Sequence, residues 1–346
     1  MIVYVGCRTT KERNARGEGL KTYAVAPHGA WTELQCLRTE ENPSFQTLDR
    51  EGKFLYSVHG DLTKVTSYRI LPDSTLEHLN TVDIGGRNPV DITVDKANRN
   101  VIVATLQGGA LYTIARNADG SLGEIVAKYA YEGKSEGKVS TIHQCLWDRT
   151  GNYLFACAQG RVNGYGQMRA LKYNHGTGVF TETSRFLART WDEPRHAAVH
   201  PNNRWVYMCE EKGNKVLYFR FDDSNGQLEA LQELSTVPET VTGYSDASEV
   251  MIDPSGRWVL VSNRYTDSIA VYRIDPLTGY LKTSGFFPCL GKTPRFFSFA
   301  PNGRCYVANE DSDTVIEFEF DSVTGQLVPT LNIVRTGSPV CLTFAE

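Results

Sequence analysis

The chain has 346 residues, a formal net charge of −4 and 41% hydrophobic residues, which is typical of a folded globular protein. The mildly acidic balance does not favour nucleic-acid binding, and no apolar run reaches the length of a transmembrane helix. The N-terminus leads directly into a strand pattern, and the eight cysteines show no Cys-x-x-Cys spacing, so we expect reduced thiols, no membrane association and a cytoplasmic location.

One pattern of short strands and polar turns recurs along the whole chain. Three strand-like runs come first: "MIVYVGC", "GLKTYAV" and "TELQCLR". Six longer units follow, and their first residues are Pro43, Pro89, Ile142, Pro194, Ala247 and Pro294, spaced 46, 53, 52, 53 and 47 residues apart. A further anchor, Pro339, is followed by a single strand, "VCLTFAE".

Self-similarity at this period is typical of propellers and other repeat folds. Six complete units and one unit divided between the termini predict a single all-β domain over residues 1–346, a seven-bladed β-propeller with four-stranded blades. We expect the C-terminal strand to pair with the N-terminal strands, because this pairing closes the ring and protects the strand edges.

The repeat also predicts which side chains meet at the central channel. The innermost strand of each blade starts at one mouth of the channel, and the antiparallel second strand ends at the same mouth. The candidates with both signs of charge fall in the fourth to seventh blades: His143, Arg195, Glu211, Arg264, Arg295 and Glu310. His196 and Glu249, one place further along their strands, and Arg8 from the divided blade are further candidates. Such a cluster indicates an anion-binding or acid–base site.

Structural explanations compete with each of these assignments. An arginine after a proline can cap loop carbonyls, and histidines such as His196 and His200 more often pack or form hydrogen bonds within a blade than act as ligands. Alternation directs only one of Glu210 and Glu211 towards the channel. The basic loop with Arg8, Lys11, Arg13 and Arg16 should overhang the same mouth, either to attract an anion or as a solvated segment. No metal-ligand spacing is present, so we expect neither a metal nor a cofactor.

Several segments resemble a known family. They are "YVGCRTTKERNARGEGLKTYAV", "IHQCLWDRTGNYLF", "PRHAAVHPNNRWVYMCEE", "DPSGRWVLVSNR" and "TPRFFSFAPNGRCYVANE". Together they resemble the seven-bladed lactonases, which include propeller-type 6-phosphogluconolactonases and the 3-carboxy-cis,cis-muconate lactonizing enzyme. The resemblance covers the whole chain and implies His143, Arg195, Glu211 and Arg264 as the catalytic set. The chain departs from the family pattern at Gly6-Cys7-Arg8-Thr9 and at Glu210.

We therefore expect a metal-independent lactonase that hydrolyses a sugar lactone such as 6-phosphogluconolactone. Glu211 or His143 would act as general base with the other as proton donor, and Arg195 and Arg264 would bind the oxyanion and an acidic group of the substrate. Predicted substrate contacts are Arg8, His196, Glu249 and Arg295. A carboxymuconate cyclase and a non-catalytic binding propeller remain as alternatives. The expected partner is a small anionic lactone or carboxylate, and the expected assembly is a monomer or weak homo-oligomer.

Overall fold

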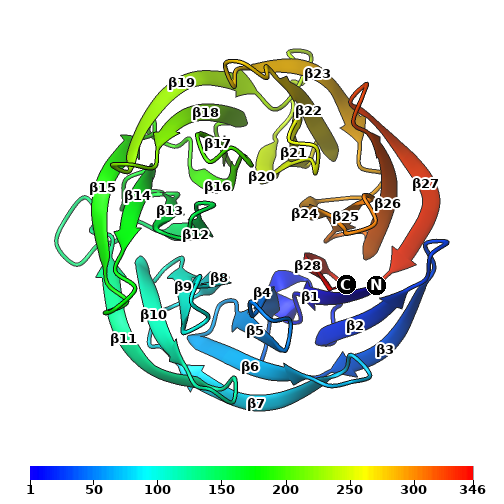
Figure 1. Cartoon of the computed structure of the whole chain (residues 1–346). Coiled ribbons are helices and arrows are strands. Elements are labelled where there is room, and N and C mark those ends of the chain that lie inside the picture. Colours follow the sequence, from blue (N-terminus) through cyan, green and yellow to red (C-terminus); the bar gives the residue numbers. More distant parts are fainter. Residues whose placement is uncertain (346) are drawn as a thin grey trace.

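Seven antiparallel sheets of four strands each stand around a central axis as the blades of a propeller (Figure 1). This arrangement is that of a computed structural model, which describes residues 1–345. The one helical segment among these residues is the 3-10 turn η1 (Lys11–Arg13), and no helix among them is long and apolar enough to cross a membrane. The predicted all-β, seven-bladed propeller is confirmed.

Each blade takes its innermost strand from the residues that follow a sequence anchor. From the axis outwards, the first four blades are β28 (Pro339–Ala345), β1 (Ile2–Cys7), β2 (Leu20–Val25), β3 (Trp31–Leu37); β4 (Pro43–Leu48), β5 (Phe54–His59), β6 (Lys64–Ile70), β7 (Leu76–Asp83); β8 (Pro89–Val94), β9 (Asn100–Thr105), β10 (Ala110–Arg116), β11 (Leu122–Ala130); and β12 (Ile142–Trp147), β13 (Tyr153–Ala158), β14 (Gln167–Tyr173), β15 (Phe180–Leu187). The last three blades are β16 (Pro194–Val199), β17 (Trp205–Glu210), β18 (Lys215–Asp222), β19 (Gln227–Ser235); β20 (Asp246–Ile252), β21 (Trp258–Arg264), β22 (Ser268–Ile274), β23 (Leu281–Pro288); and β24 (Pro294–Phe299), β25 (Cys305–Asn309), β26 (Thr314–Asp321), β27 (Gln326–Arg335).

The ring is closed by the two ends of the chain. The C-terminal strand β28 pairs antiparallel with β1, so that Ile2 lies opposite Ala345 and Val5 lies opposite Leu342. The termini therefore lie side by side in the first blade (Figure 1). This is the closure predicted from the sequence, and it leaves no gap in the ring at which another chain could add a strand.

The turn after the innermost strand is shaped by an aspartate in four blades. Oδ1 of Asp148 accepts hydrogen bonds from the backbone N–H groups of Asn152 (2.9 Å) and Tyr153 (2.9 Å). The same bonds are made by Asp49, Asp95 and Asp253. They satisfy backbone donors that a tight turn leaves without strand partners. In the fifth blade His200 stands at this place, and its Nε2 donates to the carbonyl oxygen of Gly256 in the sixth blade (2.8 Å).

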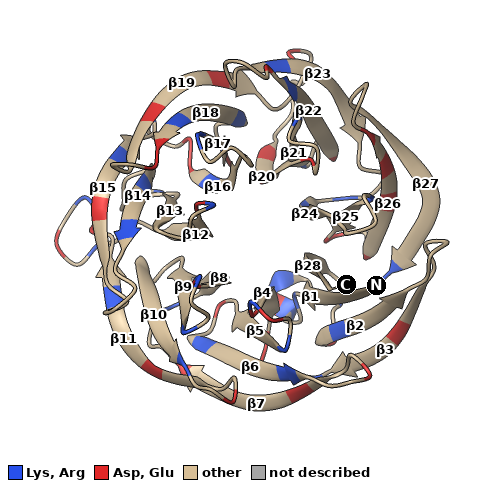
Figure 2. Ribbon diagram, viewed as in Figure 1, with Lys and Arg blue, Asp and Glu red and all other residues tan. Residues whose placement is uncertain are grey.

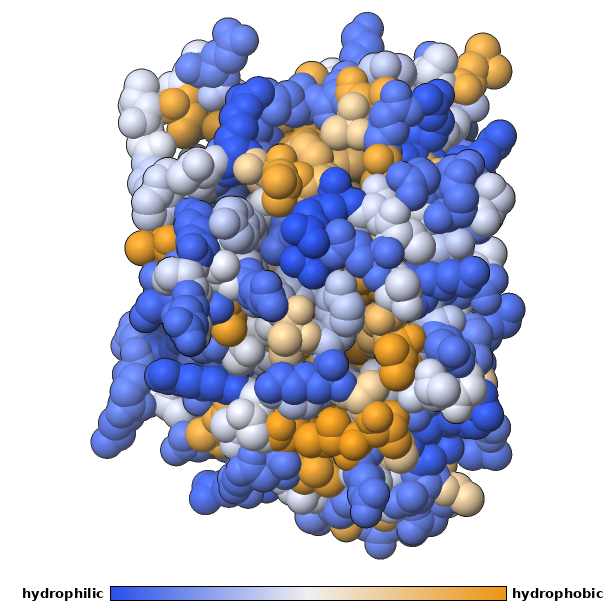
Figure 3. Space-filling view, turned by 90° about the vertical axis from the view of Figure 1, so that its left-hand side faces the viewer, coloured by the Kyte–Doolittle hydropathy of each residue, from blue (hydrophilic) through white to orange (hydrophobic). Residues whose placement is uncertain are grey.

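The hydrophobic core lies between neighbouring blades. Between the fifth and sixth blades, for example, Tyr207, Tyr218 and Tyr272 pack with valine and alanine side chains of β18, β20, β21 and β22. The hydroxyl group of Tyr207 donates to the carbonyl oxygen of Gly279 (2.8 Å), so its polar end is also satisfied. The outer wall around β15 is mostly hydrophilic with separate apolar patches (Figure 3). Packing of blade against blade holds the inner strands in fixed positions around the axis.

Candidate active site

A β-bulge interrupts the start of every innermost strand. In the fifth blade Pro194 pairs with Glu210 and His196 pairs with Cys209, so Arg195 has no partner on β17. The same irregularity occurs in the other six blades. A bulge redirects the extra residue and bends its strand. As a result, neighbouring residues such as Arg195 and His196 both line the axis instead of alternating.

The bulged residues surround a small cavity at the mouth where the innermost strands begin. Its volume is about 20 Å³, which is enough for about one water molecule. The lining residues are Arg8, Ser44, Phe45, Val90, His143, Arg195, His196, Glu249, Arg295, Phe296 and Val340. Charged residues of both signs lie on the inner strands around this opening (Figure 2). Six of the eight predicted site residues line the cavity, and the other two, Glu211 and Arg264, contact Arg195 or one another.

Glu211 is held between two arginines. Its Oε2 lies 3.2 Å from Nε of Arg195, and its Oε1 lies 3.0 Å from Nη2 of Arg264. Gln159 Nε2 also donates to Oε2 of Glu211 (2.5 Å). Burial favours the neutral carboxyl, but Arg264 and Arg195 outweigh it and lower the pKa of Glu211 to about 2. Glu211 is therefore ionised at neutral pH and fixes the orientation of both guanidinium groups.

His143 is the outermost member of a buried chain of three ionisable groups. Nδ1 of His143 lies 3.1 Å from Nε2 of His196, and Nδ1 of His196 lies 2.9 Å from each carboxylate oxygen of Glu249. Burial and the nearby Arg195 lower the pKa of His143 well below its ordinary value. Within residues 1–345, no group of three His, Cys, Asp or Glu side chains is arranged to hold a metal ion. His196 and Glu249 are both only 2% exposed, and their role as substrate contacts stays a prediction.

Arg8 and Arg295 bring further positive charge to the mouth. Nη1 of Arg8 lies 3.7 Å from Asp61, and Nη1 of Arg295 lies 3.6 Å from Glu310, so neither contact is as short as a hydrogen bond. Burial and the charge of Arg295 lower the pKa of Arg8 to about 9. Nη1 of Arg8 is buried and has no hydrogen-bond partner in the described part of the chain.

The basic loop between β1 and β2 overhangs this mouth, as predicted. Nε of Arg13 donates to Asp61 (2.8 Å) in the second blade, and Nε of Arg16 donates to Asp313 (2.6 Å) in the seventh blade. These ion pairs fasten the loop across the first blade and partly neutralise its charge. Arg8 is thus the member of the loop that reaches the channel, since it is 4% exposed and lines the cavity.

Glu210 and Glu211 have separate environments. Glu210 ends β17, the charges that act on it are those of Asp192, Lys215 and Glu233, and its Oε2 has no hydrogen-bond partner among residues 1–345. Burial and the nearby Asp192 raise the pKa of Glu210 to about 8. The two carboxyl groups therefore do not share a site, and Glu211 is the one that contacts Arg195 at the channel mouth.

Two tyrosines on the rim were not predicted from the sequence. Tyr244 and Tyr265 are 58% and 55% exposed, and their ring centroids are 4.9 Å apart. Nζ of Lys212 lies 4.7 Å from the ring centroid of Tyr244 and 3.0 Å from Asp246, which in turn lies 3.7 Å from Nη2 of Arg264. Tyr265 and Lys212 directly follow Arg264 and Glu211 in the sequence, so their proximity to the site was readable from the repeat.

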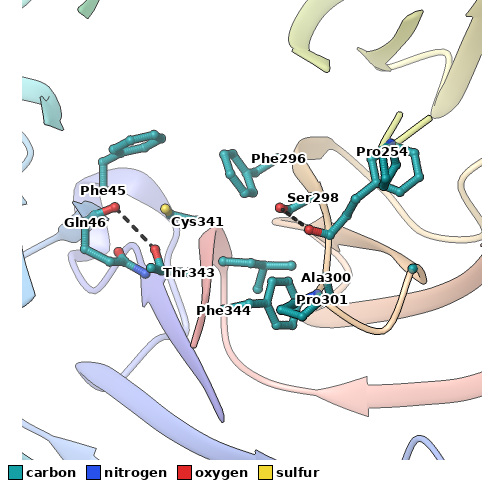
Figure 4. Close-up of a pocket in the computed structure, with 13 residues that line it drawn as sticks. Phe45, Gln46, Pro254, Phe296, Ser298, Ala300, Pro301, Cys341, Thr343 and Phe344 are labelled. Atoms are coloured by element: carbon teal, nitrogen blue, oxygen red, sulfur yellow. Dashed lines mark hydrogen bonds between the residues drawn. The ribbon is translucent and has the colours of Figure 1, made fainter. Parts of the chain in front are cut away.

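The opposite end of the channel has a different character. A pocket of about 530 Å³ opens there between β4, β24 and β28. Figure 4 shows Phe45, Phe296 and Phe344 among its lining side chains, together with Pro254 and Thr343. None of its lining residues is a lysine, arginine, histidine or carboxylate. A further pocket of about 320 Å³ is lined by Asp91, Arg149, His196 and Glu249, whereas Arg8, Arg195 and Arg295 gather at the mouth that carries His143.

The sequence matches the family described as "Lactonase, 7-bladed beta-propeller" over residues 2–344. A 6-phosphogluconolactonase of Bacillus subtilis (strain 168) is 30% identical, covering 99% of both chains. A 6-phosphogluconolactonase of Formosa agariphila is 28% identical, covering 83% of each. A solved structure of a periplasmic gluconolactonase from Pseudomonas aeruginosa has a TM-score of 0.89 and 25% identity, covering 100% of this chain and 99% of that one. The chain belongs to the lactonase family of seven-bladed β-propellers.

Proposed function

We propose that this protein hydrolyses a sugar lactone at the channel mouth, and that the substrate carries an anionic group, as 6-phosphogluconolactone does. The observation that supports this most directly is the cavity of about one water molecule beside His143, which is flanked by the guanidinium groups of Arg8, Arg195 and Arg295. A hydrolase requires such a position for water next to a base and next to oxyanion donors. The names of the relatives support the same substrate class.

His143 is the general base in this proposal. It is neutral at physiological pH, because burial and Arg195 lower its pKa. Its ring takes a proton from the water as the water oxygen attacks the lactone carbonyl carbon. The resulting oxyanion is stabilised by Arg195, which Glu211 holds in place. When the tetrahedral intermediate collapses, the bond from carbon to ring oxygen breaks and the protonated His143 returns its proton to the ring oxygen.

Glu211 has an electrostatic role here. A carboxylate with a pKa of about 2 that already binds Arg195 and Arg264 is a weak base. For this reason we propose His143 as the base, one of the two candidates that the sequence left open. Proton transfer by a positioned group contributes roughly 10²–10⁴ in rate, which is substantial for a lactone because the ring is already reactive.

The remaining cations and the rim provide substrate binding. Arg8 and Arg295 lack close anionic partners, so a phosphate or carboxylate of the substrate would complete their hydrogen bonding. Tyr244 and Tyr265 present exposed aromatic faces beside Arg264, on which the carbon-bound hydrogens of a sugar ring could rest. The eight free cysteines support the expected cytoplasmic location, because disulfides are typical of oxidising compartments.

Two alternatives predict different assay results. A carboxymuconate cyclase would use the same arginines to bind several carboxylates, and a non-catalytic propeller would fill its mouth with its own ion pairs. The Glu211 ion pairs fit that second arrangement, whereas the incompletely paired Arg8 and Arg295 fit a ligand site.

The test compares three reactions in the presence of a chelator: opening of 6-phosphogluconolactone, opening of unphosphorylated gluconolactone, and cyclisation of carboxymuconate. We expect lactone opening well above the spontaneous rate, unaffected by chelator. His143→Ala and Arg195→Ala should each remove most of it, while Glu210→Gln, a buried carboxyl outside the site, should retain it. Cyclisation without hydrolysis would identify a cyclase, and full activity in His143→Ala would place the site elsewhere.

A further inference from the structure

Under the cavity lies a buried hydrogen-bonded series of three side chains, and three successive blades contribute one member each. His143 lies near the start of β12, His196 near the start of β16 and Glu249 near the start of β20. Nε2 of His196 lies 3.1 Å from Nδ1 of His143, and Nδ1 of His196 lies 2.9 Å from Oε1 of Glu249. All three side chains are at most 5% exposed. These three groups therefore run inwards from the mouth, and His196 and Glu249 also line a second pocket of about 320 Å³.

The hydrogen bonds determine which ring nitrogens carry protons. Nδ1 of His196 faces two carboxylate oxygens of Glu249, so it must be the donor. A neutral His196 then has a free lone pair on Nε2, which can only accept from Nδ1–H of His143. The remaining nitrogen of His143, Nε2, is left with a lone pair. Glu249 thus selects, through His196, the tautomer of His143 that can accept a proton.

We propose that Glu249 and His196 are positioning residues that keep His143 in its proton-accepting tautomer and receive the positive charge formed during the reaction. This proposal rests on the proposed lactone opening at His143. As Nε2 of His143 takes the proton from the attacking water, the Nδ1 proton of His143 passes to Nε2 of His196. The cation then lies on His196, in contact with the Glu249 carboxylate. The transfers reverse when the ring oxygen is protonated, so no proton is lost or gained.

The charges around the two rings explain why this transfer is favourable. His143 is close to Arg195 on β16, Arg295 on β24 and Arg161, all of which oppose a positive charge on its ring. Burial lowers the pKa of His196, and Arg195 and Arg295 act in the same direction, but Glu249 on β20, which His196 contacts, favours the charged form of its ring. On the β4 side the edge of Phe45 faces His196, with ring centroids 6.3 Å apart. Asp91 on β8 lines one pocket with His196 and Glu249, and burial raises the pKa of Asp91 well above its ordinary value. The charge is therefore better accommodated one blade away from the reacting water.

The decisive variant is Glu249→Gln, with Glu249→Asp as the conservative variant and Glu210→Gln as the matched control. We expect Glu249→Gln to lower kcat about 10²-fold with KM within about twofold, and to move the acid limb of the kcat/KM profile to lower pH. Glu249→Asp should restore part of kcat, and Glu210→Gln should match the wild type. A higher KM with unchanged kcat would instead make Glu249 a substrate contact, and wild-type kinetics in Glu249→Gln would overturn the proposal.

A second measurement does not depend on turnover or on the folding of a variant. In wild-type protein labelled with 15N at histidine, NMR should show Nδ1 protonated and Nε2 unprotonated on both His143 and His196 at neutral pH. The opposite tautomer of His143 would refute the relay even if the lactonase assay succeeds. If the tautomers are as expected but wild-type protein opens no lactone, the proposed function fails while the hydrogen-bonded chain stands.

Discussion

The adjacent carboxyl groups Glu210 and Glu211 should respond to the same substitution with opposite changes in stability. The ion pairs with Arg195 and Arg264 lower the pKa of Glu211 from 4.5 to about 2. At about 1.4 kcal/mol for each tenfold change in proton affinity, this contributes about 3 kcal/mol to folding at pH 7. Glu211→Gln should therefore destabilise the protein by about 3 kcal/mol at pH 7, in line with the cost of leaving buried guanidinium groups without their anion.

The pH dependence of this loss follows from the sign of the pKa change. A carboxyl group whose pKa is lowered by folding stabilises the native state above its unfolded pKa of 4.5, and this contribution is lost as the pH falls towards 2. The difference between wild type and Glu211→Gln should shrink by about 1 kcal/mol at pH 4. Equal stability of the two proteins at pH 7, or a difference that does not change with pH, would refute the ionised Glu211 between two arginines.

Glu210 provides the opposite case. Burial and Asp192 raise its pKa from 4.5 to about 8, so the folded state holds a proton that the unfolded state loses above pH 4.5. Stability is thus lost as the pH rises from 4.5 to 8, by about 3 kcal/mol at pH 7. Glu210→Gln should stabilise the protein at pH 7 and have little effect near pH 4. Urea unfolding followed by tryptophan fluorescence between pH 4 and 8 measures both variants on one scale.

Three further outcomes concern substrate binding, and a fourth concerns metal dependence. Arg295→Ala should raise KM for the phosphorylated lactone about 10–100-fold, the range for losing a charged hydrogen bond, and leave the unphosphorylated lactone within about twofold. Tyr265→Ala should raise KM for both lactones about fivefold through loss of an aromatic contact, with kcat retained. Raising the salt concentration should raise KM for the phosphorylated substrate alone, as steady-state kinetics at two ionic strengths would show. Prolonged dialysis against a chelator should leave kcat unchanged, and loss of activity restored by a divalent cation would contradict the expected metal independence.

The periodicity of the sequence made it possible to predict which residues lie at the channel mouth. Because every blade starts at an anchor, residues as distant in sequence as Arg8 and Arg295 could be assigned to one mouth, and the structure brings them there. The bulges were not predictable, since an extra residue in a strand leaves no trace in a repeat of variable length. They explain why Arg195 and His196 both line the axis, which regular alternation does not allow.

The hydrogen-bond and ion-pair partners of each site residue could not be predicted from the sequence. His196 was expected to pack or to form hydrogen bonds within its own blade, but its two partners, His143 and Glu249, belong to the blades on either side. Likewise Glu211 binds Arg264 of the next blade. A single sequence shows which residues reach the mouth, whereas ion pairing depends on side-chain directions and on the distance between blades.

The charges at the mouth indicate what the site is shaped to bind. Arg8, Arg195 and Arg295 line a cavity of about 20 Å³, and burial together with Arg295 lowers the pKa of Arg195 to about 10. Three guanidinium groups in so small a space repel one another, and packing alone gives no reason for this arrangement. Glu211 compensates Arg195, but the nearest carboxylates to Arg8 and Arg295 are 3.7 and 3.6 Å away. A bound anion would offset this repulsion, so the arrangement that costs stability in the free protein supports the proposal that the lactone is anionic.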